Sequence, residues 1–488
     1  MTTRPRAPST RSGSLPRLRA VARVLALLLL AGAAAPASAS AHGLVGRTDL
    51  PIPEWLFAWV AAVVLVVSFA ALSLLWRTPL LERARPRVRL RVPAALRALA
   101  GALGVGVFAL VVYAGFAGTD VPTANLAPTA VYVVLWVGVP VVSVLLGDVF
   151  RVVSPWVALA RGAAWALRRA RGGAPLRPPL AYPAWLGRWP AAAGLLAFGW
   201  LELVYVERDD PATLALLAVL YALVQLAGMA CFGIERWRTR GDAFGVLFDL
   251  FGRIAPLELR DGAIATRPWL SGLTRFDASL PGTVALAAVA IGATTFDGAS
   301  NGELWRAVAD PLRDGLRDLG LGATAANELT GTVGLLATVL LVGGFYWLGV
   351  AGMRTVGGDR STGELAQRFV HSLVPIAFGY LLAHYFSLLV FQGQALAYLA
   401  SDPLGDGSDL LGTASATVDY AVVSASTIWY VQVGALVAGH VAGLVLAHDR
   451  ALVVYREPSE AVRSQYWMLV VMVGFTCLGL WLLSAVGT

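Results

Sequence analysis

The chain is poor in charge and in cysteine, and it has no lysine. Charged residues make up 14% of its 488 residues, whereas soluble domains contain about a quarter. Its two cysteines, Cys231 and Cys477, lie inside apolar stretches, which argues against both a structural disulfide and a thiolate metal site. All 38 basic residues are arginine, and hydrophobic residues make up 57% of the chain. This composition excludes an ordinary soluble protein and indicates a membrane protein.

The positive charge of the chain does not indicate a nucleic-acid partner. The formal net charge is +8, but residues 1–41 contain six arginines and no acidic residue, so the charge without them is +2. The other arginines are concentrated in a few segments between apolar stretches, a distribution that reports membrane topology.

The amino terminus has the three regions of a secretory signal peptide. A basic segment precedes the apolar block VLALLLLAGAA (24–34), and small residues follow it. The block is too short to span a bilayer, and the small-x-small rule allows cleavage after Ala39 or Ala41. We expect residues 1–41 to be a signal peptide whose removal leaves His42 as the first residue. An uncleaved anchor is the alternative.

Ten later segments are apolar enough to cross the ~30 Å hydrocarbon core as helices. We therefore expect an all-α fold, a polytopic transmembrane helix bundle that forms one domain over residues 42–488, with short amphipathic surface helices. The expected spans lie near residues 54–76, 97–118, 129–147, 190–206, 212–234, 281–297, 331–353, 371–395, 420–447 and 465–486.

The loops between these segments predict an orientation. With a cleaved signal peptide, the arginine-rich loop after the first span faces the cytoplasm. The four other arginine-rich loops (148–189, 235–280, 354–370 and 448–464) then lie on the same side, as the positive-inside rule requires. The prediction is a plasma (inner) membrane protein, embedded in the lipid bilayer, with both termini extracytoplasmic.

Two loops are predicted to form surface helices. Residues 242–253 place Phe244, Leu247, Phe248 and Phe251 on one helical face, which predicts a helix lying flat on the inner membrane surface. Residues 300–319 begin with Ser300 and Glu303 at capping-box spacing and continue with leucine and valine every four residues. That pattern predicts an amphipathic helix on the outer surface.

Ionisable side chains inside a bilayer are costly, so each is a candidate functional residue. Four of the five histidines lie in the eighth and ninth spans. At about 1.5 Å per residue, His384 and His440 lie within roughly 8 Å of the same depth, near the middle of the membrane. Asp297 and Glu202 lie near the outer ends of their spans. We expect His384, His440, Asp297 and Glu202 to form a catalytic site, and the alternative is that each imidazole bonds to a neighbouring backbone.

The sequence has no standard metalloprotease, phosphate-loop, serine-hydrolase or haem-attachment motif. A bound metal, if one is required, is expected to be a divalent transition metal whose ligands converge from separate helices. His384 and His440 are the candidate ligands. A new terminal His42 is a third, because its amino group and imidazole together can chelate copper.

Several segments resemble a known family. The stretches AHGLVGRTDLPIPEWLFAW, GDVFRVVSPW, ERWRTRGDAFGVLFDLFGRIAP, TTFDG and HYFSLLVFQGQ are similar to those of actinobacterial polytopic membrane proteins known as fenitrothion hydrolases. The similarity runs from about His42 to Arg450. It implies hydrolysis of a phosphotriester or thiophosphotriester, a small apolar substrate, to a diester and a phenol. Such a reaction needs an activated water and donors to the phosphoryl group.

Three classes of function follow from these observations. The resemblance favours a phosphoric triester hydrolase, and the ten spans with intramembrane histidines favour a transporter or metal-handling permease. The third is a structural subunit that depends on a second membrane subunit.

Overall fold

In the computed structural model of the protein, the described residues are 54–485, without 261, 301, 357–359 and 456. The predicted signal peptide, both cleavage sites and His42 lie outside them. The described chain is an all-α bundle, and eight of its helical segments are long and apolar enough to cross a membrane. These segments are Ala94–Ala117 (α3), Leu126–Leu146 (α4, η2, α5), Pro211–Phe232 (α9), Thr283–Ser300 (α12), Ala323–Val356 (α14, η5), Thr362–Leu399 (α15 to α17), Ala425–Val454 (α18) and Pro458–Gly479 (α19 and most of α20).

A helix covers each of the ten predicted spans. The two beyond the eight are α2 (Glu54–Leu75) and α8 (Trp189–Leu203). The 15 residues of α8 rise only about 22 Å, less than the ~30 Å of hydrocarbon. Some boundaries differ from the prediction: α14 begins eight residues earlier, at Ala323, and α18 continues to Val454.

The multi-part spans and the connecting helices have the following bounds. They are α4 (Leu126–Pro128), η2 (Thr129–Gly138), α5 (Val139–Leu146), α6 (Phe150–Val153), α7 (Pro155–Ala170), α10 (Ile234–Arg240), α11 (Ala243–Gly252), α13 (Glu303–Asp318), α14 (Ala323–Met353), α15 (Thr362–Phe369), α16 (Leu373–Gln392), α17 (Leu396–Leu399), α19 (Pro458–Ser464) and α20 (Tyr466–Ala485).

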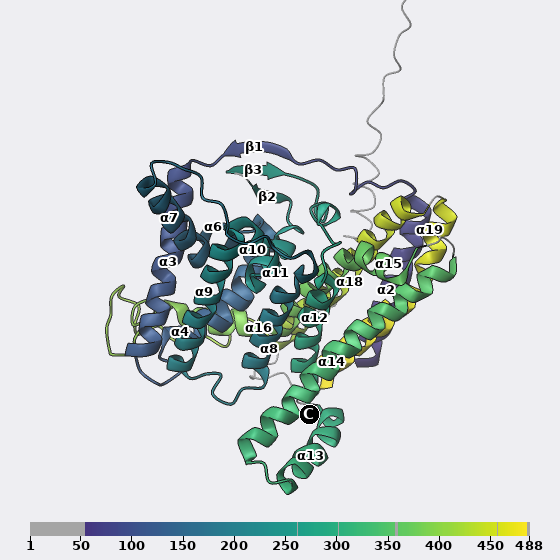
Figure 1. Cartoon of the computed structure of the whole chain (residues 1–488). Helices are drawn as coiled ribbons and strands as arrows, with labels where there is room; N and C mark the ends of the chain where they lie inside the picture. Colours follow the sequence, from purple (N-terminus) through teal and green to yellow (C-terminus); the bar gives the residue numbers. More distant parts are fainter. Residues whose placement is uncertain (1–53, 261, 301, 357–359, 456, 486–488) are drawn as a thin grey trace, which may run out of the picture.

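A small antiparallel sheet closes one end of the bundle (Figure 1). Its strands are β1 (Arg87–Arg91), β2 (Leu257–Arg260) and β3 (Ala263–Thr266), in the order β1-β3-β2. These strands come from two of the arginine-rich loops. Figure 1 places α13 at the opposite end of the molecule.

The segment predicted to lie on the inner membrane surface is instead part of the protein core. Nearly every residue of α11 is buried, including Gly245, Val246 and Leu250 outside the predicted apolar face. The helix packs against α5, α8 and α10. Because α11 is small or apolar on almost all sides, the bundle encloses it, and the prediction of a surface position was wrong.

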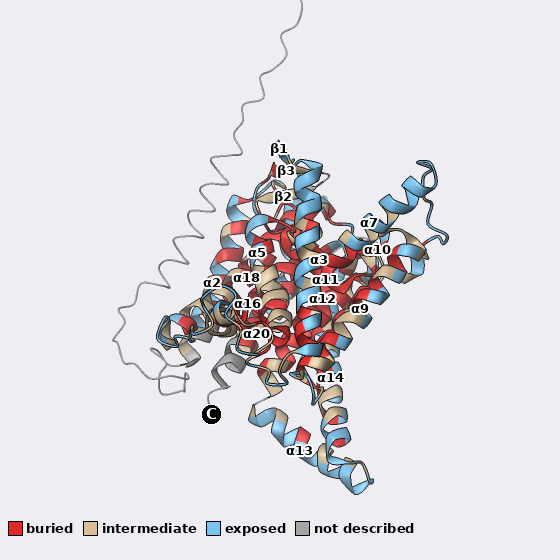
Figure 2. Cartoon of the chain, turned by 90° about the vertical axis from the view of Figure 1, so that its left-hand side faces the viewer, coloured by how far each residue is buried: buried red, intermediate tan, exposed pale blue. Residues whose placement is uncertain are grey.

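The other predicted surface helix is confirmed as an exposed amphipathic helix, and its position on the outer side of the membrane stays a prediction. Helix α13 is amphipathic and mostly exposed, and only its Ala309 is buried (Figure 2). The predicted capping box is not formed, because Gly302 is the N-cap residue and the Ser300 hydroxyl donates to the Asp297 carbonyl at 2.8 Å.

Helix α12 lies in the middle of the bundle and is buried along most of its length (Figure 2). It packs against α8, α14 and α16, and α16 in turn packs closely along α18. The polar residues near the end of α12 are therefore surrounded by α8 and α16, the two helices that carry Glu202 and His384.

Candidate functional site within the bundle

Two ionisable side chains from different helices meet inside the bundle. The Nε2 atom of His384 on α16 lies 2.7 Å from the Oδ2 atom of Asp297 on α12. The Tyr385 hydroxyl donates to the same oxygen at 2.9 Å. One carboxylate oxygen of Asp297 thus contacts both the imidazole of His384 and the phenol hydroxyl of Tyr385. These contacts orient the histidine and fix which of its ring nitrogens points to the acid.

A second carboxylate lies beside this pair. Glu202 of α8 is half-buried, and it neighbours Asp297, Tyr385 and Trp136 closely enough to interact with each electrostatically. Two carboxylates and one imidazole are expensive to bury among apolar helices, and such clusters mark ion or proton pathways in membrane proteins.

An unusual helical segment forms one wall of the site. Residues Thr129–Gly138 are π-helical, a geometry that occurs often at functional sites, although usually over a single turn. Its Trp136 packs against Tyr385 and Phe198, with ring centroids 6.4 and 4.8 Å apart. The Tyr132 hydroxyl donates to the Arg208 carbonyl at 2.7 Å. The π-helix thus places Trp136 against Tyr385 of the site, whereas the Tyr132 hydroxyl is engaged by the Arg208 backbone.

The histidine borders a small cavity. Its volume is about 20 Å³, and its lining includes Thr294, Thr295, Gly298, Tyr380 and His384. A cavity of at least about 10–15 Å³ has room for one water molecule. The His384 and Asp297 side chains retain 21% and 23% of their surface exposed, so the protein does not fully enclose either of them.

The second predicted histidine does not share this site. The Nδ1 atom of His440 lies 2.8 Å from the Leu436 carbonyl of its own helix, and its Nε2 atom is buried without a hydrogen-bond partner. His440 lines a separate, mostly apolar cavity of about 40 Å³. Tyr380 borders both cavities, and its ring centroid is 5.9 Å from that of His440. The structure brings His384, Asp297 and Glu202 together and leaves His440 beyond Tyr380.

The described residues offer little for a metal centre. Among them, no three or more histidine, cysteine, aspartate or glutamate side chains are placed so that they could hold a metal ion. The predicted ligand His440 is separated from His384, as described above. The third predicted ligand, His42, lies outside the described residues.

Tyr385, Trp136 and Tyr132 are site residues that the sequence reasoning missed. A signal for them was present, since tyrosine hydroxyls and tryptophan N–H groups inside an apolar span usually require a polar partner. Tyr385 is also the immediate neighbour of His384.

No protein-family model, curated protein or solved structure matches the chain. The class of protein is therefore defined by the structure: a multi-pass, all-α integral membrane protein with an ionisable cluster inside its bundle.

Proposed function

We propose that the protein is a proton-coupled permease of the plasma membrane in which the His384–Asp297 pair is the proton-binding site. The observation that carries the proposal is the 2.7 Å contact between His384 Nε2 and Asp297 Oδ2 inside a bundle of apolar helices. Intramembrane histidine–carboxylate groups are the usual components of proton relays in transporters.

The surrounding groups suit proton exchange. His384 has a second ring nitrogen, Nδ1, on the side of Gly298, where an added Cβ atom would lie 3.8 Å from it. The same side faces the cavity, which has room for about one water molecule. A proton that enters through this cavity reaches the imidazole, and Asp297 on its far side stabilises the resulting cation. Glu202 supplies a second acceptor nearby.

Hydrolysis of a phosphotriester is the second candidate, and one observation favours it beside the family resemblance. An imidazole held by a carboxylate and bordering a water-sized cavity is the arrangement of a general base. The reaction also needs space for the phosphoryl group within about 3 Å of the attacking water. A cavity of about 20 Å³ has room for the water but not for an aromatic triester beside it. Binding a proton needs only the His384–Asp297 pair itself, so the permease is the better-supported candidate.

The proposed orientation places both termini outside the cytoplasm. It is supported by the arginine-rich segments 77–92 and 235–280, which supply the sheet at one end of the bundle, while α13 lies at the other end (Figure 1). Under the positive-inside rule the sheet end faces the cytoplasm. In this orientation the His384–Asp297 pair, near the α13 end of α12, lies in the outer half of the membrane.

The test uses purified protein in sealed proteoliposomes with an imposed pH gradient and a pH-sensitive dye inside. Divalent transition-metal ions and small apolar phosphotriesters are added separately as substrates. We expect at least one of them to accelerate proton entry, and Asp297→Asn to abolish the acceleration. Asp310→Asn, an exposed substitution on α13, is the matched control and should retain the flux.

A parallel assay follows phenol release from a nitrophenyl phosphotriester by the same protein in detergent. Turnover there that is lost in His384→Ala, without substrate-dependent proton flux in vesicles, would replace the permease by the hydrolase. Absence of both activities would remove both candidates and leave the structural subunit.

A further inference from the structure

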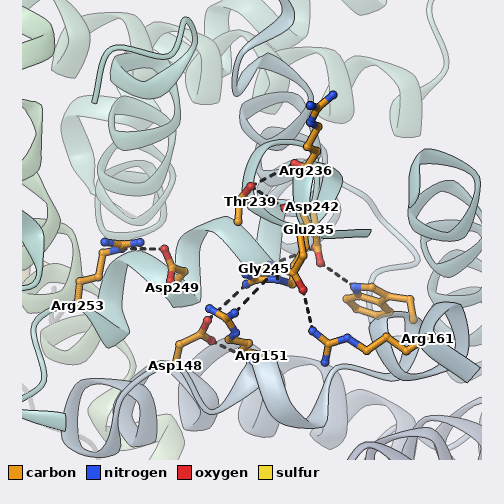
Figure 3. Close-up of polar contacts among 12 residues, drawn as sticks. Asp148, Arg151, Arg161, Glu235, Arg236, Thr239, Asp242, Gly245, Asp249 and Arg253 are labelled. Atoms are coloured by element: carbon orange, nitrogen blue, oxygen red, sulfur yellow. Dashed lines mark hydrogen bonds and ion pairs between the residues drawn. The ribbon is translucent and has the colours of Figure 1, made fainter. Parts of the chain in front are cut away.

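A large polar cavity lies at the sheet end of the bundle, away from the His384–Asp297 pair. Its volume is about 340 Å³, within the range of about 300–1,000 Å³ typical of small-molecule sites. Segments from α6, α10, α11 and the sheet contribute to it, and Figure 3 shows part of its polar network. Six arginines and four carboxylates line it.

Glu235 is the centre of one part of this network (Figure 3). Its carboxylate lies 2.8 Å from the Arg161 guanidinium and 3.0 Å from that of Arg238. Arg151 approaches the same carboxylate at 3.9 Å. A single negative charge is therefore shared by three positive ones.

The remaining carboxylates are also engaged. Asp249 pairs with Arg253 at 2.8 Å, and Arg238 reaches Asp148 at 3.7 Å. Glu258 lies 3.1 Å from Arg267 and 3.5 Å from Arg275. Arg161 and Arg275 lie outside the cavity lining, whereas Arg236 and Arg240 belong to it. The lining itself therefore contains six arginines and four carboxylates, an excess of two positive charges.

One of these carboxylates holds its proton more tightly than usual. Burial, reinforced by the nearby charge of Asp249, raises the pKa of Asp148 despite the opposing Arg238. Asp148 therefore offsets less of the positive charge as the pH falls. Arg240 is one of the lining cations, and its guanidinium lies 5.3 Å from the centre of the Tyr182 ring.

We propose that this cavity binds a phosphate group carried either by a small soluble molecule or by a lipid headgroup. Several like charges around one partly buried space are costly, and an anion placed among them offsets that cost. Guanidinium groups bind phosphate through paired, charge-assisted hydrogen bonds. The inference does not depend on the permease proposal, because the cavity and the His384–Asp297 pair share no lining residue.

Calorimetric titration of the purified, delipidated protein with inorganic phosphate tests the proposal. A second arm measures retention of phosphatidylglycerol against phosphatidylcholine by native mass spectrometry. We expect saturable binding in at least one arm, and at least about tenfold weaker binding in Arg151→Gln and in Arg240→Gln, because each removes a charged donor.

Arg161→Gln is the matched control. Arg161 pairs with the same Glu235 but is absent from the cavity lining, so its removal should change the Kd by less than about twofold. If phosphatidylglycerol does not displace bound phosphate, the ligand is a soluble molecule. If phosphatidylglycerol does displace it, the ligand is a lipid headgroup.

Two results would overturn the proposal. One is the absence of saturable binding of both phosphate and phosphatidylglycerol. The other is an equal loss of affinity in Arg161→Gln and the two lining variants, which would indicate a general charge effect. Thermal melting of each variant checks that it is folded.

Discussion

Gly379 of α16 and Gly439 of α18 lie directly against each other where the two helices cross. A Cβ atom added to either glycine would lie 3.2 Å from the Cα atom of the other. It would also lie 2.7 Å from the Ala435 carbonyl oxygen in one case and 2.6 Å from that of Pro375 in the other. Small residues that permit such close backbone approach are typical of helix pairs in membranes.

Gly439→Val should therefore separate α16 from α18. We expect a loss of about 1–3 kcal/mol of stability, as for other overpacked cores, measured as a lower midpoint of thermal unfolding in detergent. Gly434→Val on the same helix is the control, because a Cβ atom there meets nothing within 4 Å. Equal losses in the two variants would show that helix propensity, not the crossing, determines the effect.

Asp449 is predicted to be a structural carboxylate. It is fully buried, and it accepts hydrogen bonds from the Trp76 indole at 2.9 Å and from the backbone N–H groups of Leu80, Leu81 and Glu82 at 2.6–3.2 Å. Asp449→Ala leaves these donors without an acceptor and should cost on the order of 3 kcal/mol or more. Thermal unfolding measures this loss of stability. The control is the exposed Asp120→Ala, whose free energy of unfolding should lie within about 0.5 kcal/mol of the wild-type value.

Tyr385→Phe is a second test of the role of the His384–Asp297 pair in proton flux. It removes the hydroxyl that donates to Asp297 and leaves the contact with His384 in place. Substrate-dependent proton flux should fall by about tenfold, since one hydrogen bond to a charged group is lost, and it should stay above that of Asp297→Asn. The control is Tyr430→Phe on α18. A flux unchanged in Tyr385→Phe would exclude the tyrosine from the site.

The stability of the protein should depend on pH through Asp148. Its pKa in the folded protein is about 7, above the value of about 3.9 expected in the unfolded chain. The folded state therefore holds this proton more tightly, so its contribution to stability is complete below about pH 4 and is lost as the pH rises to 7.

Asp148→Asn removes this titration. The decrease in melting temperature between pH 5 and pH 8 should be smaller in Asp148→Asn than in the wild type. The exposed Asp314→Asn should retain the wild-type decrease. An identical pH profile in Asp148→Asn would show that burial does not perturb this carboxyl group.

The membrane orientation can be measured by cysteine labelling. Leu319 follows α13 and is 79% exposed, and Ala174 follows α7 and is also exposed. In a variant that lacks both native cysteines, an impermeant maleimide should label Leu319→Cys in intact cells and Ala174→Cys only after permeabilisation. The reverse pattern would invert the proposed topology.

Hydropathy was sufficient to predict the helices that form the bundle, because apolar length alone decides whether a segment can span lipid. It was not sufficient to predict how each helix is rotated. Counting residues along the spans places His384 and His440 at similar depths in the membrane. The His384 side chain nevertheless contacts Asp297, whereas the His440 side chain contacts the backbone carbonyl of Leu436. Depth can be counted from the sequence, but the direction in which a side chain points depends on packing between helices.

The short strands and α11 show a similar limit. The composition of the β1 sequence, RVRLR, predicts an arginine-rich loop. The segment forms a strand only because it pairs with β3. For α11, the apolar residues on one face were recognised, but the small and apolar residues on its other sides indicate enclosure. Both features depend on partners that are distant in the sequence.

The brevity of α8 has a consequence for the lipid around the site. A helix that rises about 22 Å is shorter than the hydrocarbon core of the bilayer by roughly 8 Å. Lipid in contact with so short a helix thins, or headgroups and water descend to meet the helix ends. Because Glu202 occupies the penultimate position of α8, such thinning would bring the aqueous phase closer to that carboxylate than a full-length span would.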